Sequence, residues 1–130
     1  MAARPWRNGA EKGYDRPVVE PPAFGLRPGR RDDFAFAEGV YIDSMRPLMI
    51  ALGSWNEAER RAALRRSYKT AEINIIMLDG ADIGWMQVSE RDTDYNLAQI
   101  QLLEEHCGNG IGTRLIRDLL ERARREGKTI

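Results

Sequence analysis

The chain has 130 residues, with 20 basic and 20 acidic side chains. That length fits one domain, and a composition of 42% hydrophobic and 31% charged residues is typical of a globular protein in water. Balanced charge argues against a general nucleic-acid binder. The longest uninterrupted apolar run, 48–52, is far short of the roughly 20 residues that a membrane-spanning helix needs.

Cysteine usage and the N-terminus indicate a compartment. The single Cys107 cannot form an internal disulfide or a cysteine-type zinc site, so we expect no metal. The first residues carry no apolar core that would make a secretory signal. Together these features predict a cytoplasmic protein.

Prolines divide the chain into two parts. Five of the six prolines lie in the first 28 residues, where regular helix is excluded. We interpret residues 1–22 as a flexible leader in preference to a docking arm, and residues 23–130 as the folded domain.

The domain begins with a short strand over 23–27 and then a helix. Asp32 or Asp33 is expected to cap this helix, and Pro47 is expected to kink or end it. A second helix is predicted to follow and to end at about Tyr68. Ser54 and Glu57 have the spacing of a capping box, which predicts its start.

Residues 71–103 change to the two-residue period of strands. Asp79-Gly80 is a strong hairpin signal, and the polar turn 91–94 separates the second and third strands of an antiparallel meander. In the third strand, alternation places Leu97, Gln99, Gln101 and Leu103 on one face and Ala98, Ile100 and Leu102 on the other.

A last helix over about 110–126 has an apolar stripe that must pack on the sheet, formed by Ile111, Leu115, Ile116, Leu119, Leu120 and Ala123. Gly127 ends this helix, and residues 128–130 look like the start of another strand. The predicted fold class is α/β (α+β), a mostly antiparallel central sheet flanked by helices.

Three glycines at alternate positions, Gly108, Gly110 and Gly112, stand between the third strand and the last helix. Glycine lets a ligand approach the backbone, and the unpaired amides that open a helix bind phosphate. Arg114 can add a charge-assisted hydrogen bond. A purely steric reason for the glycines remains the alternative.

Two better-known phosphate motifs do not fit. A Walker loop needs Lys after its last glycine, where this chain has Thr113. A dinucleotide fingerprint needs a different glycine spacing and a parallel βαβ unit, whereas these strands form a meander.

From Phe24 to Ile130 the order of elements and the glycine turn resemble N-acetyltransferases of the GNAT superfamily, as found in bacteria. Residues 108–113 resemble the acetyl-CoA pyrophosphate loop of that family, written Arg/Gln-x-x-Gly-x-Gly/Ala, with Cys107 at the Arg/Gln position. Residues 45–57 and the hairpin 79–84 add to the likeness.

The resemblance implies transfer of an acetyl group from acetyl-CoA to a primary amine by direct attack. It also implies that unpaired backbone groups of the third strand bind the pantetheine arm. The implied contacts to acetyl-CoA are Ile100, Gln101, Leu102, Cys107, Gly108, Asn109, Gly110, Ile111, Gly112, Thr113 and Arg114.

The catalytic base is not defined by the sequence. Glu104, Glu90 and Asp94 are candidates because they lie near strand ends, although solvated turn carboxylates are the preferred interpretation of each. His106 is interpreted as a surface residue. Cys107 is interpreted as a small residue that occupies the Arg/Gln position of the family's loop, with a role as a nucleophile as the alternative.

Family members continue past this helix with a strand, a helix and two more strands, so we expect the C-terminal half of the fold to be missing here. An uncovered sheet edge invites self-association. Three hypotheses follow: an acetyltransferase, a degenerate module that binds CoA or a partner without turnover, and a protein-interaction domain whose arginine-rich ends dock on an acidic partner.

The acceptor is the last expectation. Residues 71–106 carry eight acidic and one basic side chain, and a cleft with acidic walls concentrates cations. We therefore expect a cationic amine, either a small molecule or a peptide end, with no nucleic acid or membrane as partner. The alternative is that these acids only solvate turns.

Overall fold

A computed structural model describes residues 24–130, so the leader predicted for residues 1–22 lies outside the described residues. The elements in chain order are β1 (Phe24–Pro28), η2 (Arg31–Asp33), α1 (Phe34–Ala51), α2 (Glu57–Ser67), η3 (Thr70–Glu72), β2 (Ile73–Leu78), β3 (Ala81–Glu90), β4 (Tyr95–Leu102), η4 (Glu104–His106) and α3 (Ile111–Arg125).

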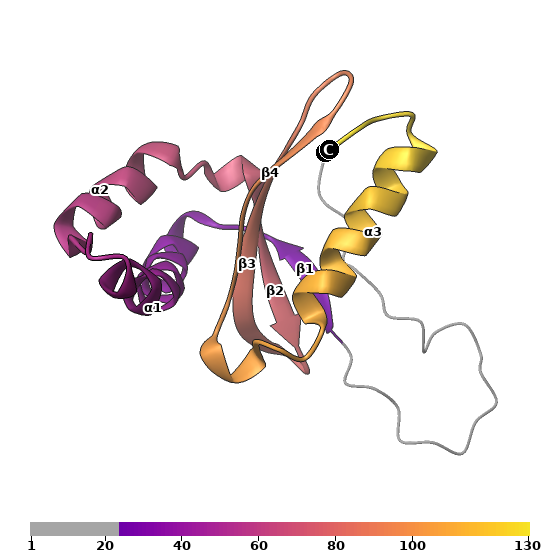
Figure 1. Ribbon diagram of the computed structural model, residues 1–130. Helices are drawn as coiled ribbons and strands as arrows, with labels where there is room; N and C mark the ends of the chain where they lie inside the picture. Colours follow the sequence, from indigo (N-terminus) through magenta and orange to yellow (C-terminus); the bar gives the residue numbers. More distant parts are fainter. Residues whose placement is uncertain (1–23) are drawn as a thin grey trace, which may run out of the picture.

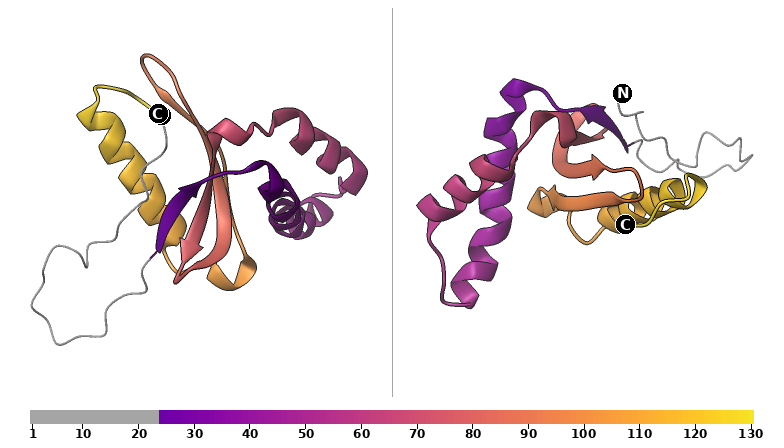
Figure 2. Two further views of the ribbon diagram at one scale, coloured as in Figure 1. Left: turned by 180° about the vertical axis from the view of Figure 1, so that it is seen from behind. Right: turned by 90° about the horizontal axis from the view of Figure 1, so that it is seen from above.

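The four strands form one antiparallel sheet in the order β1-β2-β3-β4, which confirms the predicted meander and fold class. Helices α1 and α2 cover one face of the sheet, and α3 covers the other (Figures 1 and 2). These two sides are called the α1 face and the α3 face below. The predicted hairpin turn is confirmed too, since Asp79 and Gly80 both have positive φ, as a type I′ turn requires.

The core on the α1 face is built around Trp85, which is fully buried. The Trp85 indole N–H donates to the Ala37 carbonyl in α1 over 3.0 Å, so the bulkiest core side chain has no unpaired polar atom. Buried side chains that surround it are Ala37, Val40, Tyr41, Ile42, Leu64, Ile73 and Ile75.

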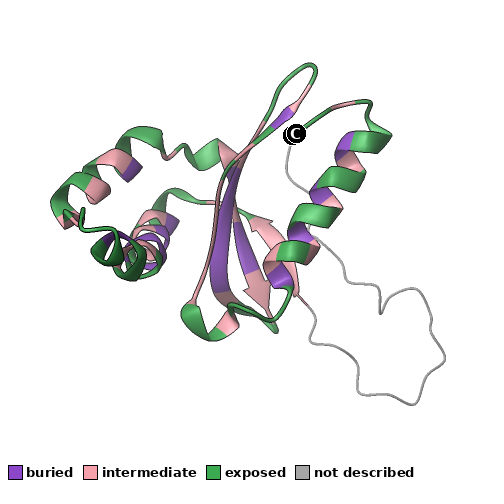
Figure 3. Ribbon diagram, in the orientation of Figure 1, coloured by how far each residue is buried: buried purple, intermediate pink, exposed green. Residues whose placement is uncertain are grey.

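The core on the α3 face follows one stripe of α3. Ile111 and Leu115 pack against β2 and β3 residues, while Leu119 and Ala123 pack against Tyr95. Ile116 and Leu120 belong to the predicted stripe but are 37% and 52% exposed. The outer side of α3 is thus mostly exposed, as Figure 3 shows.

An extra residue in β4 overturns one sequence expectation. Gln87 pairs with Gln99, whereas Val88 pairs with Leu97, so Ala98 has no partner in β3 and forms a β-bulge. A bulge shifts the two-residue alternation by one. Leu97 therefore packs on the α3 face with Val88, not on the α1 face beside Gln99 as simple alternation predicts.

The structure corrects the expected end of α1 and the expected cap of α2. From the sequence, Pro47 is expected to kink or end α1; the helix does not end there and continues to Ala51 with Pro47 inside it. The helix closes where Ser54 N–H donates to the Met49 carbonyl. Helix α2 is capped by Asn56, whose Oδ1 accepts from Glu59 N–H at 3.1 Å, and not by Ser54.

A buried ion network ties β1 to the start of α1. Asp33 sits at the N-cap position of α1, but its carboxylate binds Arg27 through two bonds of 2.9 Å and accepts from Arg30 N–H at 2.7 Å. Arg27 also binds Asp82 of β3 at 2.9 Å. The hydrogen bonds from Arg27 lower the pKa of Asp33 below its ordinary value of 3.8.

No helix within residues 24–130 is long and apolar enough to cross a membrane.

We predict that Asp33→Asn lowers the free energy of unfolding by about 2 kcal/mol, because it leaves a partly buried Arg27 without its countercharge. Since the native pKa of Asp33 is depressed, the stabilisation is present above about pH 4 and is lost as the pH falls through that native pKa. The difference in the free energy of unfolding between the wild type and the variant should therefore become smaller in acid.

Urea unfolding measured between pH 3 and pH 7 tests this prediction. Asp43→Asn is the matched control, because the Asp43 side chain is 74% exposed in its pair with Arg46, and a change below about 0.5 kcal/mol is expected. Equal losses in the two variants would contradict the assigned role of Asp33.

Candidate functional site

The glycine turn between β4 and α3 has the geometry that the sequence predicted. Gly108 and Gly110 both have φ of +79°, a conformation that L side chains rarely adopt. Gly110 is the N-cap residue of α3. The backbone therefore turns sharply from the end of the sheet into the helix (Figure 1).

Helix α3 presents free amides at this turn. Its first helical hydrogen bond runs from Arg114 N–H to the Gly110 carbonyl. The N–H groups of Ile111, Gly112 and Thr113 precede that bond, so they have no helical acceptor. Three convergent amides at the positive end of a helix dipole can bind a phosphate group.

The space above the turn is open enough for a ligand. A Cβ added at Gly108, Gly110 or Gly112 would have no atom within 4 Å apart from its chain neighbours and the nearby backbone of α3. Crowding by the rest of the fold therefore does not explain the choice of glycine at Gly112, where φ is ordinary. A pyrophosphate of acetyl-CoA fits these residues, because its oxygens need close backbone approach and N–H donors.

The edge of β4 supplies a second set of backbone groups. Leu103 N–H donates to the Ile83 carbonyl, and Trp85 pairs with Gln101. Because hydrogen bonding alternates along an antiparallel pair, the N–H and C=O groups of Ile100 and Leu102 point to the open edge. The backbone of Gln101 faces β3 instead, so of the three predicted β4 contacts it is the one without edge-facing groups.

The far end of the same edge is partly paired. Tyr95 N–H donates to the Thr129 carbonyl at 2.8 Å, and Thr129 N–H donates to the Thr93 carbonyl at 3.2 Å. Asp94 and Thr129 thereby form a parallel bridge. The sequence predicted the start of a strand over residues 128–130, and the structure has an isolated bridge at Thr129 in that place.

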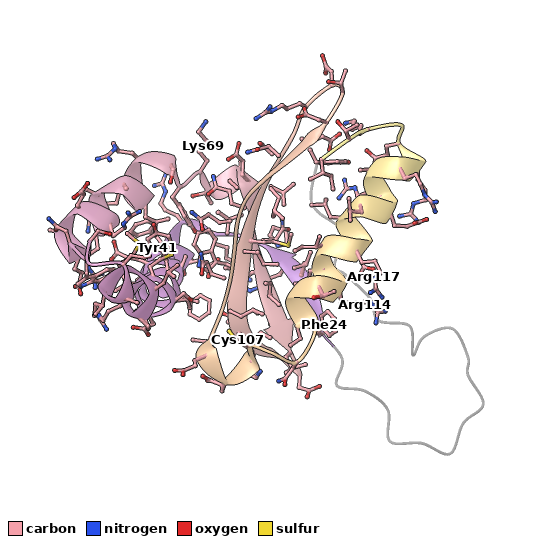
Figure 4. The ribbon with its side chains drawn as sticks, in the orientation of Figure 1. Phe24, Tyr41, Lys69, Cys107, Arg114 and Arg117 are labelled. Carbon is pink, nitrogen blue, oxygen red and sulfur yellow. The ribbon has the colours of Figure 1, made fainter. Side chains whose placement is uncertain are left out.

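The side chains that flank the loop include Cys107 and Arg114 (Figure 4). Cys107 is exposed, and its sulfur lies 3.5 Å from the Leu103 carbonyl oxygen and 3.7 Å from that of Leu102. Arg114 lies 3.8 Å from Asp118 on the next turn of α3. Asn109 and Thr113 are exposed, whereas the Ile111 side chain is buried in the core.

The three carboxylates proposed as bases lie at opposite ends of β4. Glu104 follows the glycine-loop end and is exposed. Glu90 and Asp94 lie around the β3–β4 turn, about 24 Å away along the eight residues of β4. Glu90 binds Lys128 at 2.8 Å, and Asp94 lies 3.4 Å from Arg91. Only Glu104 lies near the edge-facing amide of Leu102.

Sequence reasoning missed a cluster that joins α3 to the start of β4. The buried Tyr95 hydroxyl donates to Glu126, and its ring lies 5.0 Å from the Lys128 ammonium and 5.3 Å from the Arg122 guanidinium. Burial, and then the bond to Glu126, raise the pKa of Tyr95 to about 12. The only sequence signal was the high density of charges near the C-terminal end of α3.

Among residues 24–130, no three His, Cys, Asp or Glu side chains are grouped so that they could hold an ion.

Comparison with known proteins gives the family. The model of the acetyltransferase (GNAT) family matches residues 33–130, so the chain belongs to that family. No curated protein sequence matches the chain.

Solved structures share the fold. A putative acetyltransferase from Pyrococcus horikoshii has a TM-score of 0.58 at 16% identity, over 87% of this chain and 39% of its own. N-acetylglutamate synthase from Neisseria gonorrhoeae, complexed with coenzyme A and N-acetyl-glutamate, has a TM-score of 0.54 at 18% identity, over 85% of this chain and 24% of its own. A GNAT family acetyltransferase from Brucella melitensis, in complex with acetyl-CoA, has a TM-score of 0.54 at 26% identity, over 81% of this chain and 71% of its own. This chain thus spans well under half the length of the first two proteins.

We predict that Gly110→Ala weakens acetyl-CoA binding at least tenfold, because a side chain at positive φ forces the backbone to move and turns the amides of the first helical turn away. Gly53→Ala is the matched control. Gly53 ends α1 with φ of +75° and also has open space around its Cβ position. Both variants should lose about 1 kcal/mol of stability.

Calorimetric titration with acetyl-CoA measures the affinity of each variant, and urea unfolding of the same samples measures its stability. Equal affinities in the two variants would show that the loop does not bind the pyrophosphate.

Proposed function

We propose that the chain transfers an acetyl group from acetyl-CoA to a primary amine by direct attack. Membership of the GNAT family supports acetyl transfer as the class of reaction. The observation that carries the proposal is the pair of left-handed glycines that present the first amides of α3 to open space. These amides would hold the pyrophosphate.

The edge of β4 would hold the other end of the co-substrate. The pantetheine arm carries amides, which pair with edge-facing groups of a strand. The N–H of Ile100 or Leu102 would then meet the thioester oxygen and stabilise the negative charge that develops there. Bound acetyl-CoA supplies the acetyl thioester, and the amine displaces CoA thiol from its carbonyl carbon.

The attacking amine must be neutral, so a base has to accept its proton. We propose Glu104 for this role, directly or through water. It is exposed and lies two residues beyond Leu102. Glu90 and Asp94, in contrast, hold cations at the far end of the strand.

We predict that Glu104→Gln lowers kcat/KM for acetyl transfer about 100-fold at neutral pH, the size expected for loss of a general base. Glu105→Gln is the matched control, because Glu105 is also exposed in η4, and a change within twofold is expected. Thiol release from acetyl-CoA with a primary amine is the measurement. Equal rates in the two variants would remove Glu104 from the mechanism.

An alternative function is binding of CoA or a protein partner with little turnover. The open edge of β4 favours it, as do Leu120 and Ile130, which are 52% and 47% exposed. Acetyl-CoA binding without thiol release would select this alternative. Light scattering on the same sample reports the self-association that such a surface favours.

We propose further that the acceptor is cationic and that the acidic side chains of the β3–β4 turn, called the acidic turn below, raise its local concentration. Asp92 and Asp94 lie on this turn, about 24 Å from the glycine-loop end of β4. That distance exceeds the screening length of about 8 Å at physiological ionic strength, so the effect is expected to be small.

We predict that Asp92→Asn combined with Asp94→Asn raises KM for a diamine about twofold in low salt and leaves KM for a neutral amine unchanged. The difference should vanish at 0.5 M salt, because exposed charges are then screened. A salt-independent effect, or none, would exclude the acidic turn from acceptor choice.

A further inference from the structure

The α1 face of the sheet carries a row of amide side chains next to the edge of β4. Gln101 lies opposite Trp85, and Gln99 lies opposite Gln87, so all of these side chains project to the same face. Gln101 Nε2 donates to Gln99 Oε1 at 2.9 Å. Gln99 and Gln101 are both partly exposed, which leaves them accessible to a ligand.

Gln87 forms the buried back of this row. It is 3% exposed, and its Nε2 donates to the Ser67 carbonyl and to Glu72, both at 2.8 Å. These two bonds fix the amide orientation. Its Oε1 is buried and accepts no hydrogen bond from any described residue. Because Gln87 pairs with Gln99, the row contains an acceptor oxygen that no described side chain or backbone group satisfies.

The row lies where an acceptor must arrive, an argument that rests on the proposed function. Gln99 and Gln101 flank Ile100, whose N–H faces the edge where the thioester oxygen would lie. On the α3 face, the side chains of Ile100 and Leu102 are covered by Ile111 and Leu115. On the α1 face, helix α1 also contacts β4, but the side chains of Gln99 and Gln101 stay partly exposed there. An amine that approaches the carbonyl carbon from the α1 face would therefore pass over the two glutamines.

Neutral amides select a particular chemistry. Each carries two N–H donors and one acceptor oxygen, and none has a charge that would favour an ion. A site built to hydrogen-bond hydroxyl groups discriminates strongly against analogues without them, because its own polar atoms are then left unpaired. We propose that Gln99 and Gln101, backed by Gln87, select an amine with hydroxyl groups on neighbouring carbons, the chemistry of an amino sugar.

Two ring amines of similar size test the inference. 2-Amino-2-deoxyglucose has hydroxyl groups beside its amine, and cyclohexylamine has none. We expect kcat/KM to favour the amino sugar at least tenfold. The double variant Gln99→Leu with Gln101→Leu should abolish the preference by raising KM for the amino sugar, with cyclohexylamine changed less than twofold.

Asn96→Leu is the matched control, since Asn96 is an exposed amide elsewhere on β4. The preference of this variant for the amino sugar over cyclohexylamine should stay at the wild-type value. Transfer to cyclohexylamine with no preference for the amino sugar would overturn the inference while leaving the proposed function intact. An equal fall in kcat/KM for both amines in the double variant would also overturn the inference, because the glutamines would then only support the structure of the strand.

A readout without turnover separates the two proposals further. In the presence of CoA, 2-amino-2-deoxyglucose should shift the NMR signals of the Gln99 and Gln101 side-chain amides, and cyclohexylamine should not. Unmoved amide signals, with CoA bound, would overturn the inference whether or not transfer occurs.

Discussion

The extra residue at Ala98 in β4 is the constraint on which the rest of the site depends. It changes which side chains meet α3, so that Leu97, Ile100 and Leu102 all pack beneath one helix despite their uneven spacing. Helix α3 can then lie along the whole strand. Its N-terminus is held at the end of β4 where the glycine turn begins, and the side chains of Gln99 and Gln101 are left on the opposite face.

Charge in this protein serves mainly to join segments. Asp82 and Glu90 belong to the acidic block that the sequence suggested as a substrate wall, yet each is paired with a cation from another part of the chain. Arg27 joins β1 to α1 and β3 through two carboxylates. Counting charges along a sequence therefore overstates the field that a substrate meets, because paired ions largely cancel at a distance.

The sequence predicts the local features well because their causes are local. Asp79-Gly80 dictates its own turn, and the glycines before α3 dictate theirs. The misses have long-range or subtle causes. The bulge at Ala98 depends on pairing with β3, and the cap at Asn56 competes with Ser54 two residues earlier. The Tyr95 cluster joins residues far apart in the chain, so no local pattern reveals it.

The bridge between Asp94 and Thr129 has a consequence for the order of folding. Strands β2, β3 and β4 are joined by short turns, so these three strands can pair early, whereas β1 reaches β2 only across α1 and α2. The bridge is parallel, and Asp94 and Thr129 are separated along the chain by β4, the glycine turn and all of α3. It can close only after α3 has docked, so it forms later, and with a larger entropic cost, than the turns that join β2 to β3 and β3 to β4. During synthesis, the glycine turn would thus be in place before this part of the β4 edge is covered.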